Sequence, residues 1–331
     1  MRIPSQSFQS LECVIHRRTL RENSEVITTS LERAARALQG GALVAIPTET
    51  VYGLAADARN EAAVLSIYAV KGRPSNHPVI VHIAEVDQLD EWAINIPTWA
   101  RALAETFWPG PLTLILPRAA HVGDWITGGQ ESVGVRAPDH ALTLALLRES
   151  GLGVAAPSAN RFGSLSPTSA AAVLEELGEY LDPAEDLILD GGECEIGVES
   201  TIVSCLGSAP SILRLGAITA EQIAIVSGLN VVAVDPSVRA PGTLAQHYSP
   251  RAHVCMEVNE KCEAIIALAD VDTPLGMVRL ASPDTVAQYA HELYAAMREA
   301  DHRGYTCIAV IPPSGEGIAA AVRDRITRAS A

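Results

Sequence analysis

The chain has few aromatic residues, few lysines and no long apolar run. Aromatic residues make up 4% of its 331 residues, so a buried core has to come from the aliphatic part of its 48% hydrophobic content. No segment approaches the roughly 18 consecutive apolar residues that cross a bilayer as a helix. The N-terminus has neither a continuous apolar stretch nor a small-residue cleavage site, the marks of a secretory signal. We therefore expect a cytoplasmic protein without membrane contact.

Cysteine is sparse and unpaired along the chain. The six cysteines stand at positions 13, 194, 205, 255, 262 and 307, and none belongs to a C-x-x-C pair. The separation of Cys255 and Cys262 does not match a zinc knuckle. In a reducing cytosol, isolated cysteines usually serve as small buried apolar residues. The sequence therefore predicts neither a disulfide framework nor a structural metal.

Positive charge is also scarce, because 24 basic residues face 39 acidic ones and the net charge is −15. Such a balance argues against a general nucleic-acid binder, which neutralises phosphates with a basic face. It leaves room for a local basic cleft that binds a small phosphorylated ligand. Only Lys71 and Lys261 are lysines. Because all other basic residues are arginines, Lys71 indicates a place that favours a compact ammonium group.

Short apolar runs alternate with amphipathic segments, the pattern of an α/β domain. Strands are predicted at 42–46, 78–83, 112–116, 132–136, 153–156, 186–189 and 200–204. Helices with recognisable caps and stop signals are predicted at 30–39, 60–72, 139–150 and 168–177. Some consecutive strands leave no room for a crossover helix, so we expect a twisted sheet of mixed direction.

The periodicity fades between residues 228 and 250, a stretch with three prolines, which we interpret as a linker. Beyond it a small Rossmann-like α/β domain is predicted, although it contains no G-x-G-x-x-G and no P-loop. Its strands are expected at 254–258, 277–280 and 306–311, and its helices at 260–268, 284–300 and 317–328. The resulting division is an N-terminal extension at 1–27, a main domain at 28–227, the linker at 228–250 and the small domain at 251–331.

Polar motifs follow the predicted strands, at the place where α/β sheets bind ligands. PTETVYGL at 47–54 comes directly after the first strand. KGRP at 71–74 holds Lys71 and Arg73 on a turn that Pro74 prevents from continuing as a helix. The compact ammonium group of Lys71 beside the planar guanidinium of Arg73, which can bind two oxygens at once, suits a polyphosphate. Each motif alone fits an ordinary turn, a helix cap or a solvated charge pair equally well.

Further segments supply hydroxyls, amides and cations. AAPSAN at 155–160 combines small residues with Ser158 and Asn160, and its backbone N–H groups can form an anion-binding nest. Two glycine-rich stretches, at 191–201 and 212–216, add hydroxyls and Arg214. The end of the strand predicted at 132–136 adds Arg136. Histidines 77, 82, 121 and 140 lack metal-ligand spacing and are interpreted as structural. A site rich in cations and hydroxyls, without a Ser-His-Asp signature, suits phosphoryl or nucleotidyl transfer.

These motifs, in this order, resemble those of the YrdC-like threonylcarbamoyl-adenylate synthases. The resemblance rests on PTETVYGL, KGRP, WPGPLTLIL, VGVRAP, AAPSAN, LSPT, GVESTIV and ILRLG, which lie between residues 30 and 216. APGTLAQHYSP and the tail that follows it are similar to the family's long, two-domain form. The resemblance implies a twisted sheet enclosing a basic cleft. It also implies an enzyme that joins L-threonine, bicarbonate and ATP into threonylcarbamoyl-AMP, with release of pyrophosphate and water.

The resemblance also implies two sets of binding residues. Threonine would contact Thr48, His82, Arg136, the backbone at Ala156, and Ser200. ATP would contact Lys71, Arg73, Ser75, Ser132, Ser158, Asn160, Ser166, Arg214 and, from the linker over the cleft, Tyr248. Lys71 and Arg73 would be the catalytic residues that stabilise the transferring phosphates. Mg²⁺ would arrive on the triphosphate and would need no protein side chain.

The implied product would supply a tRNA threonylcarbamoyl transferase machinery, with at most a weak contact between this chain and tRNA or other RNA. The sequence departs from the family pattern at Leu215, where a proline usually follows the arginine, and in the linker, where GTLAQHY replaces a basic GMKYKHY form. A carbamoyl-adenylate-forming, HypF-like enzyme is an alternative, but its C-x-x-C pairs and acylphosphatase module are not visible. A non-enzymatic RNA-binding module is a second alternative, against which the negative charge weighs.

Overall fold

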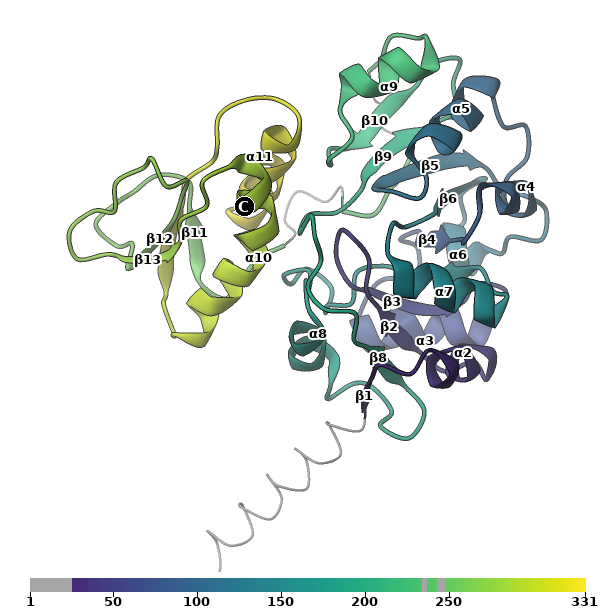
Figure 1. The fold of residues 1–331 in the computed structure, drawn as a ribbon, viewed down its shortest axis with the longest axis horizontal. Coiled ribbons are helices and arrows are strands. Elements are labelled where there is room, and N and C mark those ends of the chain that lie inside the picture. Colours follow the sequence, from purple (N-terminus) through teal and green to yellow (C-terminus); the bar gives the residue numbers. More distant parts are fainter. Residues whose placement is uncertain (1–25, 234–236, 243–247) are drawn as a thin grey trace, which may run out of the picture.

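The computed structural model describes residues 26–233, 237–242 and 248–331. These residues form a ten-stranded sheet and a separate four-stranded sheet, each with its own helices (Figure 1). The larger sheet has both parallel and antiparallel pairs, and the smaller one is entirely parallel. The predicted α/β fold with a mixed sheet and a small second α/β unit is confirmed. Most of the predicted N-terminal extension lies outside the described residues.

The large sheet has the strand order β1-β8-β2-β3-β7-β4-β6-β5-β9-β10. Its strands are β1 (Ile27–Thr28), β2 (Val44–Ile46), β3 (Gly53–Asp57), β4 (Ile80–His82), β5 (Leu112–Pro117), β6 (Ser132–Arg136), β7 (Val154–Ala155), β8 (Leu187–Leu189), β9 (Thr201–Ser204) and β10 (Ser211–Arg214). Several neighbours in this order, such as β8 and β2 or β3 and β7, come from distant parts of the chain. The sheet therefore brings together motifs that are far apart in the sequence.

Helices cover both faces of this sheet. They are α2 (Leu31–Gln39), α3 (Glu61–Lys71), α4 (Leu89–Trp92), α5 (Thr98–Phe107), α6 (Asp124–Thr127), α7 (Ala141–Ser150), α8 (Ala170–Leu177) and α9 (Ala220–Ser227), with a 3-10 turn at Val86–Gln88. Strand β2 shows how the two faces differ. Val44 and Ile46 pack in the cluster that contains the apolar side chains of α2 and α7, whereas Ala45 packs in the cluster that contains those of α3 and α5. Alternate side chains of one strand thus enter two separate cores.

The small domain consists of β11 (His253–Cys255), β12 (Ala264–Ile266), β13 (Val278–Ala281), α10 (Val286–His302), β14 (Cys307–Val310) and α11 (Ile318–Ala329). Its strand order is β11-β14-β12-β13. Helices α10 and α11 lie on the side of this sheet that faces the large domain (Figure 1). The helices that hold the small sheet together are therefore also the ones that contact the large domain.

Helix ends follow the caps expected from the sequence in α2 and α3. Ser30 accepts a hydrogen bond from the Arg33 amide, and Asn60 accepts one from the Ala63 amide. Gly72 ends α3 at φ 61°, the left-handed conformation that glycine adopts without strain. The helix predicted from 168 starts two residues later, because Ser169 supplies its N-cap, and the one predicted from 139 begins at Ala141 after His140.

Several predicted elements are wrong. The motif at 47–54 is only partly a turn, because Gly53 begins β3, which pairs antiparallel with β2. Its residues Leu54, Ala55 and Ala56 are fully buried, but they lack the β-branched side chains from which a strand is predicted. Part of the glycine-rich stretch at 212–216 is likewise strand β10. Helices α5 and α9 were not predicted.

The helix predicted at 260–268 is replaced by a turn and strand β12. The Cys262 amide bonds the Asn259 carbonyl to form the turn, and Ala264–Ile266 then run between β14 and β13. A short, fully apolar run fits a buried parallel strand and a buried helix equally well. Residues 264–266 form a strand because both faces of the sheet are buried at this place. Among the helices of the described residues, none has the length and hydropathy that crossing a bilayer requires.

Candidate active site

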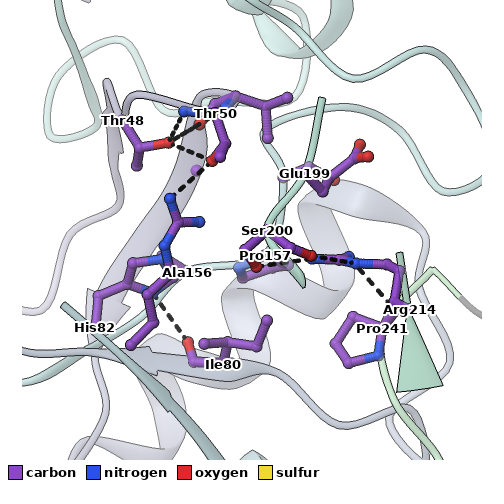
Figure 2. A pocket seen from close by; sticks show the side chains of 14 residues that line it. Thr48, Thr50, Ile80, His82, Ala156, Pro157, Glu199, Ser200, Arg214 and Pro241 are labelled. Carbon is purple, nitrogen blue, oxygen red and sulfur yellow. Dashed lines mark hydrogen bonds between the residues drawn. The ribbon is translucent and has the colours of Figure 1, made fainter. Parts of the chain in front are cut away.

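A pocket opens in the large domain where the predicted motifs converge (Figure 2). It is lined by Thr48, Thr50, Val51, Gly53, Ile80, His82, Arg136, Ala156, Pro157, Ser158, Glu199, Ser200, Arg214 and Pro241. Figure 2 shows Thr48, Thr50 and His82 on one side of the pocket and Arg214 and Pro241 on the other. All five residues predicted to bind threonine line this pocket, together with Ser158 and Arg214 from the ATP set.

Arg136 is held at the C-terminal end of β6. Its guanidinium lies 2.7 Å from a carboxylate oxygen of Glu49, donates to the Thr50 hydroxyl at 2.9 Å and donates to the Gly110 carbonyl at 3.3 Å. Both members of the Arg136–Glu49 pair are buried. The guanidinium is therefore fixed in position before any ligand arrives, as recognition of a carboxylate or phosphate requires.

The loop between β2 and β3 is organised by the Thr48 hydroxyl. It donates to the Val51 carbonyl at 2.6 Å and accepts from the amides of Thr50 and Val51 at 3.1 and 3.2 Å. Gly53 lies directly beside Ala156, and an added Cβ at Gly53 would lie 3.2 Å from the Ala156 Cβ. Small residues on both strands keep the two backbones close and leave room for a ligand.

His82 contributes a neutral, buried imidazole. Its Nδ1 lies 3.3 Å from the Ile80 carbonyl. Burial, and then the positive charge of Arg136, lower its pKa from 6.5 to about 3. At neutral pH the ring therefore offers hydrogen bonds without charge, which agrees with a structural and ligand-shaping histidine rather than a proton donor.

Arg214 and Ser200 form the opposite wall. Arg214 donates to the Ser200 carbonyl and hydroxyl, both at 3.0 Å, and the Ser200 hydroxyl lies 2.8 Å from that of Thr113. Arg214 also donates to the carbonyl of Pro241 at 3.2 Å. A residue of the predicted linker thus completes the wall of the pocket.

Lys71 lies behind the pocket. Its ammonium donates to the Ser158 carbonyl at 2.6 Å and to the Asn160 carbonyl. The Asn160 side-chain amide in turn donates to the Arg161 carbonyl at 2.8 Å and the Ser164 carbonyl at 2.7 Å. Burial, and then the charge of Arg73, lower the Lys71 pKa well below 10.5. Lys71 therefore holds the AAPSAN turn in place through these two carbonyl bonds.

Arg73, the second predicted catalytic residue, is also buried. It donates to the Pro78 carbonyl at 2.9 Å and its guanidinium carbon lies 5.7 Å from the centroid of the Phe162 ring. Burial lowers its pKa to about 10, so it remains charged at neutral pH. Neither Lys71 nor Arg73 lines the pocket.

Four other predicted ATP contacts, like Asn160, do not line the pocket. Ser132 is buried at the start of β6, and Ser166 donates to the Glu199 carboxylate at 2.6 Å. Tyr248 is buried against α10, where its ring lies 5.7 Å from that of Tyr294. Ser75 is exposed and lines a different hollow, with Asp124 and Gly128.

The described part of the linker is tied to the large domain. The backbone N–H and side chain of Arg239 bond Gln130, Asn76 and Gly128 at 2.8 to 2.9 Å. Gly242 has φ 77°, and an added Cβ there would lie 2.3 Å from the Tyr248 hydroxyl oxygen. The linker residues 243–247, where GTLAQHY departs from the basic family form, lie outside the described residues.

Glu199 was not predicted, although it is a carboxylate inside the otherwise neutral GVEST motif. It lines the pocket and accepts from Arg325 of α11 at 2.6 Å and from Tyr294 of α10 at 3.2 Å. Arg325 also donates to the Leu215 carbonyl at 2.9 Å, at the position where the family pattern has proline. Glu49 was missed in the same way inside PTETVYGL. Arg325 gave no signal, because it lies in a charged terminal helix far from any motif.

The fold and the pocket define an α/β protein whose binding site presents fixed arginines, hydroxyls and a neutral histidine at strand ends, a combination suited to carboxylate and phosphate groups. Two family models divide the chain. Residues 36–216 match the model described as "Telomere recombination", and residues 218–331 match "Threonylcarbamoyl-AMP synthase, C-terminal domain". The chain belongs to the threonylcarbamoyl-AMP synthase family.

Individual relatives agree with this assignment. The chain is 39% identical over 321 residues to the threonylcarbamoyl-AMP synthase of Pyrococcus abyssi, covering 90% of this chain and 93% of the relative. It is 45% identical over 246 residues to that of Bacillus subtilis, covering 71% and 69%. The crystal structure of P. abyssi Sua5 complexed with L-threonine superposes with a TM-score of 0.81 at 37% identity, covering 91% of this chain and 94% of the other.

Proposed function

We propose that this protein is an L-threonylcarbamoyladenylate synthase, an adenylyl-transferring enzyme that converts L-threonine, bicarbonate and ATP into threonylcarbamoyl-AMP, pyrophosphate and water. The observation that carries the proposal is the convergence of Thr48, His82, Arg136, Ala156 and Ser200, from five separate segments, in one pocket. The relation to a chain crystallised with L-threonine supports the identity of the amino-acid substrate.

Threonine would be held by its carboxylate on Arg136, whose guanidinium is already oriented by Glu49 and Thr50. The hydroxyls of Thr48 and Ser200 would bond the polar groups of the amino acid. Ala156 and Gly53 would let the substrate approach the backbone. The uncharged His82 ring, whose Nδ1 faces the Ile80 carbonyl, would offer its other nitrogen as a hydrogen-bond acceptor to the substrate amine, and only the free amine can react.

The reaction needs no nucleophile from the protein. The free amine of threonine combines with bicarbonate to give a carbamate and water. A carbamate oxygen then attacks the α-phosphorus of ATP, the bond from that phosphorus to the bridging oxygen breaks, and pyrophosphate leaves. The product is a mixed carbamic–phosphoric anhydride. The protein contributes alignment and stabilisation of the charge that develops on the phosphates.

The phosphates would occupy the side of the pocket formed by Arg214 and Ser158, next to the turn that contains Asn160. Lys71 and Arg73 would add positive potential from beneath the AAPSAN turn, and Lys71 would also hold that turn through its carbonyl bonds. Ser75, Ser132, Ser166 and Tyr248 complete the proposed ATP set. Of these, Ser75 is the contact that ATP bound in the pocket would have to extend farthest to make, because Ser75 lines a separate hollow.

Magnesium would enter on the triphosphate of ATP, where it would neutralise charge on the leaving pyrophosphate. The two carboxylates of the site fit this arrangement, because Glu49 and Glu199 are each engaged by an arginine. Neither is placed to serve as a dedicated metal ligand. In this scheme the protein holds the nucleotide and the nucleotide holds the metal.

We further propose that the enzyme works in the cytoplasm as two domains, residues 28–227 and 251–331, joined by the linker at 228–250. Its product would pass to a separate tRNA threonylcarbamoyl transferase machinery. Contact of this chain with RNA would be weak, in keeping with its net charge of −15.

The test is release of pyrophosphate from ATP by the purified protein with Mg²⁺ and bicarbonate, scanning each amino acid in turn. Release that depends on both threonine and bicarbonate, with mass-spectrometric detection of threonylcarbamoyl-AMP, is the expected result. Activity with carbamoyl phosphate in the absence of threonine would replace the proposal with the carbamoyl-adenylate reaction. Retention of RNA with no turnover under any condition would replace it with a binding module.

A further inference from the structure

Three cysteines that are distant in sequence meet in the small domain. Cys255 ends β11, Cys262 lies in the turn before β12, and Cys307 begins β14. Their sulfur atoms all lie within 4.8 Å of one another. The Cys307 sulfur is 3.5 Å from that of Cys255 and 3.8 Å from that of Cys262. Three thiols grouped around Cys307 form a tripod of potential ligand atoms.

The parallel sheet explains why these residues converge. Strand β14 lies between β11 and β12, and its register pairs Cys307 with His253 on one side and Ile308 with Ala264 on the other. The sulfur atoms therefore come from three adjacent chain segments at one end of the sheet. Along the sequence, 45 and 52 residues separate Cys307 from its two partners, so no short motif reveals the cluster.

The tripod lies on the side of the sheet away from the helices. Ala264, Ile266, Ile308 and Val310 pack in the cluster that contains the apolar side chains of α10 and α11. Cys262 and Cys307 pack instead with Ile265, Ala267 and Ala309, with Cys255 and Met277 at the margin. The tripod thus has an apolar floor, while the half-buried Cys255 leaves it reachable from one side.

Two of the three sulfur separations match those of a metal site. Zinc–thiolate bonds of about 2.3 Å in a tetrahedron place the sulfur atoms about 3.8 Å apart, and the two closest pairs lie at 3.5 and 3.8 Å. A disulfide would require about 2.05 Å. The backbone of Cys307 is also fixed from outside, because the Glu263 carboxylate accepts from the Thr306 amide at 2.7 Å and the Cys307 amide at 3.3 Å. Such supporting bonds orient ligands in known metal sites.

A fourth ligand is at hand. His253 is the register partner of Cys307 and stands two residues before Cys255 in β11, so it shares their side of the sheet. Its side chain is exposed and can turn towards the three sulfur atoms without disturbing a core. Three cysteines and one histidine are a usual ligand set of structural zinc sites.

We propose that Cys255, Cys262 and Cys307, completed by His253, bind one zinc ion that clamps strands β11, β14 and β12 together. The bound ion would stabilise the face of the four-stranded sheet that helices α10 and α11 do not cover. This site is separate from the pocket of the large domain and does not rest on the proposed function. Because the thiols must lose their protons to bind, affinity should rise with pH.

The test uses the full-length protein, reduced and freed of metal by a chelator. Titration with Co²⁺ as a spectroscopic probe should saturate at one ion per chain with thiolate charge-transfer absorption, and Zn²⁺ should displace it. Zinc should also protect the three cysteines from alkylation, as mapped by mass spectrometry. Failure of the unmodified protein to bind one equivalent with thiolate absorption would overturn the proposal, as would formation of a Cys255–Cys307 disulfide in place of metal binding.

Variants separate this site from adventitious binding. Cys262→Ser and Cys307→Ser should each weaken Zn²⁺ binding by roughly a hundred-fold or more, and His253→Ala by roughly ten- to a hundred-fold. Cys205→Ser, which changes a buried cysteine of the large domain, is the matched control and should bind as the unmodified protein does. If Cys307→Ser fails to fold, Cys255→Ser at the half-buried edge provides the same comparison. Equal affinity in all variants would overturn the proposal.

Discussion

The guanidinium of Arg325, in the last helix of the chain, lies 2.6 Å from the carboxylate of Glu199, in the wall of the pocket, and both side chains are buried. The next residue is Ser200, whose carbonyl and hydroxyl bond Arg214. A second contact joins the same two domains where Arg298 of α10 lies 2.7 Å from Glu176 of α8. The small domain therefore supports one wall of the pocket directly.

Arg325→Met should destabilise the protein by about 3–5 kcal/mol, because removal of one partner leaves a buried charge unpaired. It should also lower turnover by displacing Ser200. Denaturant unfolding and pyrophosphate release are the measurements. Arg328→Met is the control on the same helix, since its pair with Asp324 is partly exposed and such pairs contribute about 0–1 kcal/mol. Equal losses in the two variants would rule out a special role for the interdomain pair.

Glu199 should make stability fall in acid. Burial alone would raise its pKa, but the positive charges of Arg325 and Arg214 outweigh that effect and lower it from 4.5 to about 2. The stabilisation is present above the unfolded pKa and is lost as pH falls from about 4.5 towards 2. Unfolding free energies measured across this range should show that slope in the unmodified protein and a reduced slope in Glu199→Gln. An unchanged slope would show that other carboxylates are responsible.

His82 should act in a higher pH window. Its pKa in the folded protein is about 3, below the ordinary 6.5, so the unfolded chain binds a proton that the folded chain does not. Stability contributed by the neutral ring is complete above 6.5 and declines as pH falls from 6.5 towards 3. His82→Gln should flatten the unfolding free energy in that window. A profile identical to that of the unmodified protein would place the acid sensitivity elsewhere.

Arg136→Ala should reduce kcat/KM for threonine by about 100- to 1,000-fold, with a smaller effect on the KM for ATP, because we propose that the lost group pairs with the substrate carboxylate. Arg136→Lys should recover only part of this loss, since a lysine cannot reproduce the planar fork. Titration of each substrate at saturating levels of the other makes the comparison. A larger effect on ATP than on threonine would assign Arg136 to the nucleotide.

Lys71 should affect both turnover and folding. Lys71→Ala is expected to lower turnover by about 100- to 1,000-fold, the usual result of losing one charge-stabilising donor. Its bonds to the Ser158 and Asn160 carbonyls indicate that stability falls as well, because the substitution leaves two carbonyls without a donor. Turnover and the unfolding midpoint should be measured on the same preparation, with exposed Lys261→Ala as control. Near-normal turnover would remove Lys71 from the mechanism.

The sequence was most informative where local chemistry decides the structure. Ser30, Asn60 and Gly72 predicted their helix ends because capping depends on neighbouring residues only. Strand β6 matched its predicted bounds because its apolar alternation is regular. Strands β3 and β12 could not be predicted in this way, since their small or uniformly apolar residues become strands through pairing that includes distant segments, β7 for β3 and β14 for β12.

The same distinction applies to the site. Thr48, Arg136 and Ser200 were recognised because each stands in a motif next to a strand end, and the fold brings those ends together. Arg325 stands in no motif, and its role depends on how α11 packs against the large domain. The three-cysteine tripod was missed because Cys255 and Cys262 do not have the spacing of a zinc knuckle, and Cys307, 45 residues beyond Cys262, joins them only through the pairing of β14 with its neighbours.

Pro241 gives the linker a part in the shape of the binding site. This residue lines the pocket and its carbonyl binds Arg214, while Arg239 ties the same segment to the large domain. Removal of the chain beyond residue 216 would therefore do more than uncover the pocket, because it would also change the shape of the pocket. It would have a wider mouth, an Arg214 with one fewer anchor and a differently shaped wall, so the boundary between the two family models crosses the cavity itself.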